Sequence, residues 1–411
     1  MKKLIALLLA LVLVLGLAAC AGDPATDTTD TTDTTDTTDT TDTTDTTDTT
    51  DTTDTTDTTD TTDTTDTTED TTTEADYSKV ALITDVGTID DESFNQATWQ
   101  GVVEFCEANG VEYNYYQPTE DSNDARLVSI TTAIADGYDV IVMPGYLFGA
   151  TLGEAQNLYG DKAYFIAIDV GEGDLGGAVP GAKTTCFTFA EEQAGYLAGY
   201  AVVKDGYTKL GFLGGIAVPA VQRYGYGFIQ GADAAAQELG ITVDMKYTYG
   251  NTFSADPAIT AKMEGWYQSG TEIVFACGGG IYGSAVEAAV QYEGMVVGVD
   301  VDQHYIGESE SYPYNPFVTS AMKGLQSTTV SVLSDLFSGN FSKYAGQINN
   351  LSLAVGDYVG LPTAESSWGF KTFTLDEYNA VLEKIKSGEI VVSNDVSAMP
   401  ETTAVTVEEI Q

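Results

Sequence analysis

From Val80 onward, the chain alternates short apolar, β-branched runs with longer stretches of helical spacing. In the first half, apolar runs lie at 80–84, 111–116, 140–144 and 164–168, with helical stretches around 94–108, 124–136 and 152–159. In the second half, runs lie at 210–214, 243–249, 273–276 and 296–299, with helical stretches at 190–203, 221–239, 257–269 and 284–292. Such alternation predicts parallel sheets with right-handed crossovers. Two sets of four units predict an α/β protein with two similar lobes.

The chain is expected to cross between the lobes more than once. We place these crossings at the extended runs 183–189, 316–321 and 350–355, with a helix over 323–337 returning to the first lobe. The N-terminal lobe then comprises 77–185 and 318–345, and the C-terminal lobe 186–317 and 346–411. The alternative is a single crossing between two independent domains, which composition alone does not exclude.

The first twenty residues have the pattern of a targeting segment. Lys2 and Lys3 precede an apolar run, 4–17, that is short for a membrane span. The sequence Leu-Ala-Ala-Cys that ends at Cys20 is typical of a bacterial lipobox. We therefore expect a signal peptide over 1–19 and a lipid on the sulfur of Cys20, which anchors the protein at the extracytoplasmic face of the cell membrane. The alternative is an ordinary secretory signal that happens to end in cysteine.

Residues 20–76 are predicted to be a disordered tether. Asp-Thr-Thr repeats fill most of the segment, and residues 21–76 carry 19 acidic side chains and no basic ones. Such a composition cannot bury enough apolar surface to offset the entropy of ordering. A flexible coil of this length spans roughly 40 Å, and a fully extended one about 185 Å. That reach suits a thick cell wall and favours a Gram-positive source.

Composition also excludes several kinds of chemistry and partner. The net charge of −46 argues against nucleic acid. His304 is the only histidine, which disfavours zinc sites and histidine-dependent catalysis. Cys106, Cys186 and Cys277 stand in apolar surroundings and are interpreted as small buried hydrophobes rather than redox groups. We expect neither a cofactor nor a bound metal.

The stretch 79–101 predicts a ligand site. A short strand is followed by a polar, glycine-bearing loop over 85–91 and by a helix that begins near Ser93. Ligands of α/β proteins bind where a buried parallel strand ends and its loop leads into a helix.

Five ordered motifs carry a resemblance to a known family; they lie at 79–101, 211–231, 277–280, 298–303 and 319–323. Together they resemble the basic membrane protein family, whose members are substrate-binding lipoproteins of ABC importers and whose best-understood members bind purine nucleosides. The resemblance implies a two-lobed fold of the periplasmic-binding-protein type I, with several hinge crossings. It also implies a permease and an ATPase as partners, and these must be separate chains because this sequence has no phosphate-binding G-x-x-x-x-G-K-[ST] loop.

The resemblance implies roles for three side chains. Phe94 is the ring that stacks on the nucleobase, and Asn95 is the polar group that reads it. Tyr224 takes the place of a second stacking ring, here with an added hydroxyl that needs a partner. The alternative for both rings is that they are ordinary core aromatics.

Four further residues are expected around the ligand. Asp300 ends a predicted strand and would accept hydrogen bonds from the two hydroxyls of a ribose diol. Asp302 is the alternative residue for this role, but we prefer Asp300 and expect Asp302 to cap the next loop. Lys323 would reach the sugar and compensate Asp300, or else be a solvated surface lysine. Gly278 and Gly279 would let the backbone approach the ligand, or simply form a turn.

One departure from the family leaves the preferred base open. Nucleoside-binding members commonly carry an aspartate in the loop after the third strand, where it contacts the base edge. In the loop 144–152 the corresponding position is expected to be Ala150. The ligand could therefore be a purine held loosely, another nucleobase, or a nucleoside-like compound.

Two other functions stay open. Asp85, Asp90 and Asp91 resemble part of the calcium cluster of nucleoside hydrolases, but one ligand position holds Ile83 and the spacing differs. We expect these acids to cap the helix that begins near Ser93 and to shape the cleft, and we count Asp85 among the ligand-binding residues. The third possibility is a surface receptor that senses a ligand without importing it, which a fold cannot distinguish from transport.

Overall fold

A computed structural model describes residues 77–410. The predicted signal peptide, Cys20 and the tether lie outside the described residues. Within 77–410, no helix combines the length and the apolarity that crossing a membrane requires.

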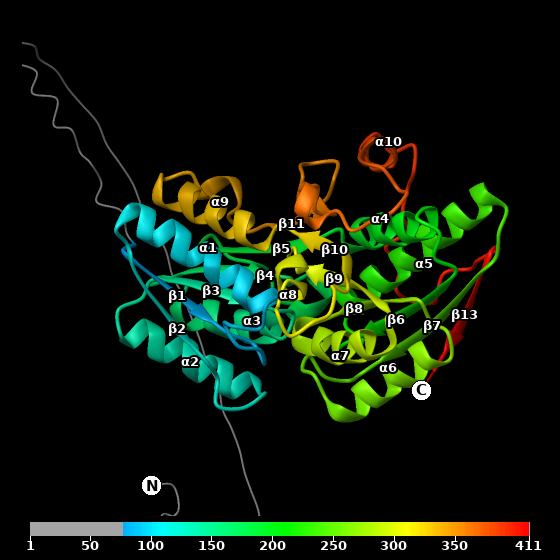
Figure 1. Cartoon of the computed structure of the whole chain (residues 1–411). Coiled ribbons are helices and arrows are strands. Elements are labelled where there is room, and N and C mark those ends of the chain that lie inside the picture. The colour runs from blue at the N-terminus through cyan, green and yellow to red at the C-terminus, as the bar shows by residue number, and fades with distance from the viewer. Residues whose placement is uncertain (1–76, 411) are drawn as a thin grey trace, which may run out of the picture. The chain divides into compact units, whose positions relative to one another are not determined.

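The first sheet has six parallel strands. Their order is β11 (Ile348–Leu351), β5 (Thr184–Phe189), β4 (Tyr164–Ile168), β3 (Val140–Pro144), β1 (Lys79–Ile83), β2 (Glu112–Tyr116). The helices of this lobe are α1 (Phe94–Asn109), α2 (Asn123–Ala135), α3 (Phe148–Tyr159) and α9 (Leu325–Phe337), with short turns at η1 (Glu172–Leu175) and η3 (Phe341–Lys343). Figure 1 shows α1 and α9 together on one side of the sheet and α2 on the other.

The second sheet has seven strands. Their order is β12 (Val359–Gly360), β10 (Phe317–Lys323), β9 (Met295–Asp300), β8 (Ile273–Cys277), β6 (Lys209–Gly214), β7 (Val243–Tyr249), β13 (Val405–Glu409), and only β12 is antiparallel to its neighbour. The accompanying helices are α4 (Glu191–Lys204), α5 (Pro219–Leu239), α6 (Pro257–Gln268), α7 (Tyr282–Tyr292), α8 (His304–Gly307) and α10 (Leu375–Lys386), with turns at η2 (Gly279–Ile281) and η4 (Glu365–Ser367). The predicted fold class, two parallel sheets flanked by helices, is confirmed.

The strands are buried on both faces. In β1, Val80 and Leu82 belong to one hydrophobic cluster, and Ala81 and Ile83 to another. Successive side chains of a strand point to opposite faces, so a strand covered by helices on both sides is apolar throughout. This is why the continuous apolar runs of the sequence predicted the strands well.

The lobe boundaries differ from the expected ones at three strands. The run expected at the first crossing is β5, which lies wholly in the first sheet, and the chain crosses only at Ala190. The run expected at the second crossing is β10, which lies in the second sheet, and the crossing follows at Gly324, before α9. β11 lies in the first sheet, and the third crossing covers 352–358. An extended apolar run has the same pattern in either sheet, because the pattern does not reveal which neighbour accepts its hydrogen bonds.

Helices α4 and α5 pack backbone against backbone through four glycines. A Cβ atom placed on Gly195 of α4 would lie 2.1 Å from the carbonyl oxygen of Tyr224, and one placed on Gly199 would lie 2.1 Å from that of Phe228. The reverse contacts are as tight, because a Cβ on Gly227 or Gly231 of α5 would lie 2.1 or 2.0 Å from a carbonyl oxygen of α4. The close approach matters because the start of α5 lines the cleft described below and the first turn of α4 lies behind it.

We predict that Gly227→Ala destabilises the protein by about 1–3 kcal/mol, because the new methyl group forces the two helices apart. The matched control is Gly265→Ala on α6, where no atom lies within 4 Å of the new Cβ. Alanine should be neutral or slightly stabilising there because of its higher helix propensity. Urea denaturation of both variants measures the difference, and equal stability would contradict the packing argument.

Candidate ligand-binding cleft

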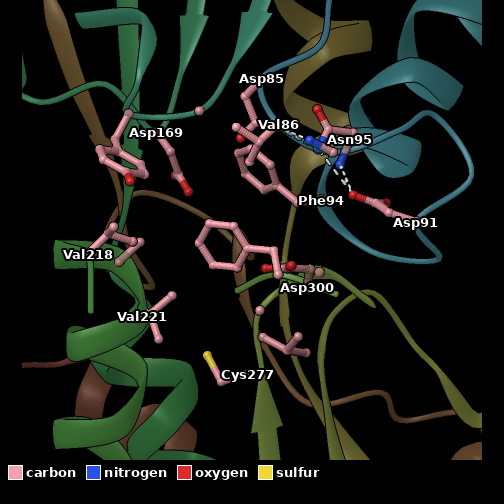
Figure 2. Close-up of a pocket in the computed structure, with 18 of the residues that line it drawn as sticks. Asp85, Val86, Asp91, Phe94, Asn95, Asp169, Val218, Val221, Cys277 and Asp300 are labelled. Carbon is pink, nitrogen blue, oxygen red and sulfur yellow. Dashed lines mark hydrogen bonds between the residues drawn. The ribbon is translucent and has the colours of Figure 1, made fainter. Parts of the chain in front are cut away.

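A cavity of about 300 Å³ lies between the carboxyl ends of the two sheets. Its walls come from the loops after β1, β3 and β4 in the first lobe and from the first turn of α5 and the ends of β8, β9 and β10 in the second. All eight residues predicted as ligand-binding line it: Asp85, Phe94, Asn95, Tyr224, Gly278, Gly279, Asp300 and Lys323. Figure 2 shows Asp85, Phe94 and Asn95 above the cavity and Asp300 opposite them. That these side chains contact a ligand remains a prediction.

Asp91 caps helix α1. Its Oδ1 accepts hydrogen bonds from the backbone N–H groups of Ser93 (3.0 Å) and Gln96 (3.1 Å), and its Oδ2 accepts from that of Asn95 (3.0 Å). Burial raises the pKa of Asp91 to about 6, although these bonds oppose the rise. The expected capping role is therefore confirmed for Asp91.

Asn95 is held between two carboxylates (Figure 2). Its side-chain amide donates to Asp85 Oδ1 at 3.0 Å and to Asp91 Oδ2 at 3.1 Å. Its own Oδ1 is buried without a hydrogen-bond partner among the described residues. Because both amide hydrogens are engaged, Asn95 can offer a ligand only a hydrogen-bond acceptor.

The three acids of the hydrolase alternative do not converge. Asp90 is exposed and does not line the cavity. Asp85 Oδ1 accepts from the backbone of Gly87 at 2.8 Å as well as from Asn95, and burial raises the pKa of this carboxyl. Among residues 77–410, no group of three or more His, Cys, Asp and Glu side chains is placed to hold a metal ion.

Aromatic rings from both lobes border the cavity: Phe94 and Tyr146 come from the first lobe, and Tyr224 and Phe253 from the second. Phe94, the first residue of α1, lies with its ring centroid 4.6 Å from Lys323 Nζ, and the ring of Tyr224 on α5 lies 5.7 Å from the same atom. Tyr224 is only 2% exposed and meets the core ring of Phe275 edge-on, with centroids 5.9 Å apart. Tyr224 is therefore a core aromatic that also forms part of the cavity wall, and its stacking on a ligand stays a prediction.

Lys323 joins the two lobes through carboxylates. Its buried ammonium is ion-paired with Asp169 of the first lobe, and lies 3.5 Å from Glu191 Oε1 and 3.7 Å from Asp300 Oδ1. Burial lowers the pKa of Lys323, but the carboxylates outweigh this and raise it. The expected pairing with Asp300 is present, whereas the alternative of a solvated surface lysine is wrong.

A second cation extends this cluster. Arg223 Nε donates to Glu191 Oε2 at 2.7 Å and lies 4.0 Å from Glu192 Oε2. Burial raises the pKa of Glu191, but Arg223 and Lys323 more than compensate and hold it below its ordinary value. Burial and the charge of Glu191 raise the pKa of Glu192 to about 7.

Two consecutive residues of the first lobe bind the second lobe beside the cavity. Ser93 Oγ donates to Asp300 Oδ2 at 2.6 Å, and the carbonyl oxygen of Glu92 accepts from Gln303 Nε2 at 2.9 Å. The hydroxyl of Tyr305 also donates to the Glu92 carboxylate. The chain segment that bears Phe94 is thus fixed to the opposite lobe.

The two glycines after β8 are required by conformation. Gly278 and Gly279 have φ values of 136° and 51°, which favour glycine. A Cβ atom on Gly278 would also lie 2.9 Å from the ring of Phe253, another cavity residue. The expected tight turn is therefore present, and the approach of this backbone to a ligand stays a prediction.

The expectation for Ala150 is wrong. This residue is exposed on α3 and does not line the cavity; Gly145 and Tyr146 do so from the same loop. Helix α3 begins at Phe148 rather than near 152, which places Ala150 within the helix. An aspartate at position 150 would therefore not have faced the cavity.

Sequence reasoning missed several charged residues of the site, among them Asp174, which also lines the cavity. Asp169 and Arg223 line the cavity, and Glu191 stands behind them against Lys323. The sequence contained a signal for Asp169. This residue directly follows the fourth predicted strand of the first lobe, and Asp300 stands at the end of the fourth strand of the second lobe.

A family model described as "ABC transporter substrate-binding protein PnrA-like" matches residues 78–395. The chain belongs to this family, Bmp. The resemblance to basic membrane proteins is thereby confirmed.

Curated relatives carry related names. The chain is similar to the "ABC transporter nucleoside-binding protein BmpA" of Lactococcus lactis subsp. cremoris, with 28% identity over 57% of this chain and 66% of that one, just under two thirds. It is also 28% identical to "Basic membrane protein A1" of Borrelia garinii subsp. bavariensis, over 69% of this chain and 79% of that one.

Solved structures of solute-binding proteins share the fold. The match to an ABC transporter solute-binding protein from Aeropyrum pernix K1 has a TM-score of 0.63 at 20% identity, and covers 77% of this chain and 94% of that one. A solute-binding protein from Conexibacter woesei gives 0.61 at 21% identity over 77% and 99% of the two chains. These matches support a two-lobed type I fold, and at such identities they show the fold alone.

The buried carboxyl of Glu192 predicts how stability depends on pH. Its pKa in the folded state, about 7, exceeds its ordinary value of 4.5, so the folded state holds the proton more tightly. Its contribution to stability is therefore full below pH 4.5 and is lost as pH rises to about 7, a change of about 3 kcal/mol. Unfolding followed from pH 5 to 8 should show a shallower fall with pH for Glu192→Gln than for the wild type. The same slope in both proteins would refute this assignment.

Proposed function

We propose that this protein is a substrate-binding protein that holds a nucleoside, with purine nucleosides as first choice, between its two lobes. The observation that carries the proposal is the pair of rings, Phe94 and Tyr224, that reach one cavity from opposite lobes. Stacking of a base on an aromatic ring contributes about 1–3 kcal/mol per base. Hydrogen-bonding carboxylates around the rings suit the hydroxyl groups of a sugar.

We further propose that the lobes close on the ligand around Ala190, Gly324 and 352–358, and that the closed form is recognised by the permease. Hinges of this kind are a few connecting residues that absorb the change in backbone angles. The bonds from Glu92 and Ser93 to the second lobe support this, because they form only when the lobes are together. The permease and the ATPase would be separate chains, and the protein would bind without catalysis.

Anchoring to the membrane is the remaining part of the proposal. Lipid on Cys20 and the acidic tether would place the lobes outside the cell, at a distance from the membrane. The lipobox pattern supports it, as does membership of a family of transporter substrate-binding proteins.

Ligand class is tested by a thermal-shift panel. Nucleosides should raise the melting temperature in proportion to the logarithm of their concentration once in excess, and free bases or pentoses should have little effect. Both halves of the ligand are needed because stacking and hydroxyl recognition act together. Stabilisation by sugars or amino acids alone would sink the proposal.

The hydrolase alternative predicts a chemical product. The protein, incubated for hours with inosine, adenosine or guanosine and calcium, should release no free base detectable by chromatography. Catalytic release of base would move the assignment to a hydrolase.

The role of Phe94 is tested by two substitutions. Phe94→Ala should weaken nucleoside binding by about 1–3 kcal/mol, or roughly 5- to 150-fold, because one stacking face is lost. Phe94→Leu keeps much of the apolar volume but has no ring face, so it should recover only part of the loss. Calorimetric titration gives both affinities, and unchanged binding by Phe94→Ala would rule out the stacking role.

A further inference from the structure

We propose that Asp169 is a further ligand-binding residue, which accepts a hydrogen bond from a hydroxyl group of the ligand's sugar. The inference rests on the proposed function and adds a specificity-determining residue to it. In Figure 2 the Asp169 side chain extends toward the cavity from the first lobe, on the side away from Asn95 and Asp91.

Asp169 and Asp300 are counterparts in the two lobes. Asp169 follows β4, the fourth strand of the first lobe in chain order, and Asp300 ends β9, the fourth of the second. Both adopt the left-handed backbone conformation, with φ values of 59° and 65°, and both are ion-paired with Lys323. Non-glycine residues in this conformation are uncommon and gather at functional sites. The shared conformation turns both carboxylates toward one ammonium in the cavity wall.

The two carboxylates differ in how many acceptor positions are taken. Both oxygens of Asp300 have a neighbour: Oδ2 accepts a hydrogen bond from Ser93 Oγ at 2.6 Å, and Oδ1 lies 3.7 Å from Lys323 Nζ, an ion-pair contact rather than a hydrogen bond. Asp169 uses only Oδ2, which pairs with Lys323. Its Oδ1 is buried without a hydrogen-bond partner among the described residues, in a side chain that is 8% exposed. A buried acceptor left unpaired is costly, so a donor supplied by the ligand would be bound strongly there.

The surrounding charges select a neutral donor. Asp169 faces Lys323 on β10, Glu191 in the first turn of α4 and Arg223 near the start of α5. Asp300 on β9 is ion-paired with the same Lys323. A cationic group would meet the ammonium and the guanidinium, and an anionic group would meet three carboxylates. A hydroxyl adds no charge and can donate to a carboxylate in a short, charge-assisted bond.

The substitution Asp169→Asn tests this with little change of shape. The positive charge of Lys323 should select the amide oxygen, so the NH2 group takes the place of Oδ1 and an acceptor becomes a donor. Lys323 keeps Glu191 and Asp300 as partners, so the variant should fold, and its melting temperature checks this. Asp124→Asn, at an exposed position in the first turn of α2, is the matched control. Asp169→Ala is the second variant, which removes the acceptor without adding a donor.

Calorimetry measures each protein against a nucleoside that the wild type binds and against its 2′-, 3′- and 5′-deoxy forms. For one of these hydroxyls, its removal and the Asp169→Asn substitution should each weaken binding about 10- to 100-fold. When the hydroxyl is removed and Asp169 is substituted as well, binding should weaken little more than with either change alone. Removal of either of the other two hydroxyls should weaken binding by the same factor in the variant as in the wild type.

Additive losses for all three deoxy forms, or unchanged affinity of both Asp169 variants, would overturn this inference and leave the proposed function intact. Failure of the wild type to bind any nucleoside would overturn both.

Discussion

A single buried ammonium, that of Lys323, holds the cleft together. It stands at the end of β10, where the chain is about to cross between lobes, and pairs with Asp169 of the first lobe and Asp300 of the second. Buried charges are tolerated only when they are paired, and removing one partner leaves the other uncompensated. Lys323 therefore sets the charge of the cavity and also adds to the hydrogen bonds of Glu92 and Ser93 that join the lobes.

The cluster around Lys323 has more negative than positive groups. Asp169, Glu191, Glu192 and Asp300 face only Lys323 and Arg223, and burial raises the pKa of Glu192 to about 7. Such an excess disfavours an anionic ligand and favours one rich in hydrogen-bond donors. The tight glycine packing of α4 against α5 helps to maintain the cluster, because it fixes Glu191 beside Arg223.

Much of this architecture could be predicted from the sequence, for identifiable reasons. Strands buried on both faces are apolar throughout, so the runs at 80–84 and 140–144 were unambiguous. Phe94 and Asn95 could be placed because the motif at 79–101 resembles that of a known family. The sequence did not reveal to which lobe each of the strands β5, β10 and β11 belongs, because periodicity does not identify the neighbouring strand. Ala150 was misplaced because the start of α3 was set four residues late. The position of Asp169 after a predicted strand was a signal in the sequence, but its pairing with Lys323, 154 residues away, is visible only in the structure.

We propose that a nucleoside occupies the cavity between the lobes. The most direct measurement is mass spectrometry of the small molecules released on denaturing protein that was purified without added ligand. The account predicts release of a nucleoside, and Phe94→Ala purified in the same way should release much less. Release of a sugar, an amino acid or a nucleotide in its place, in amounts close to one per protein, would contradict it.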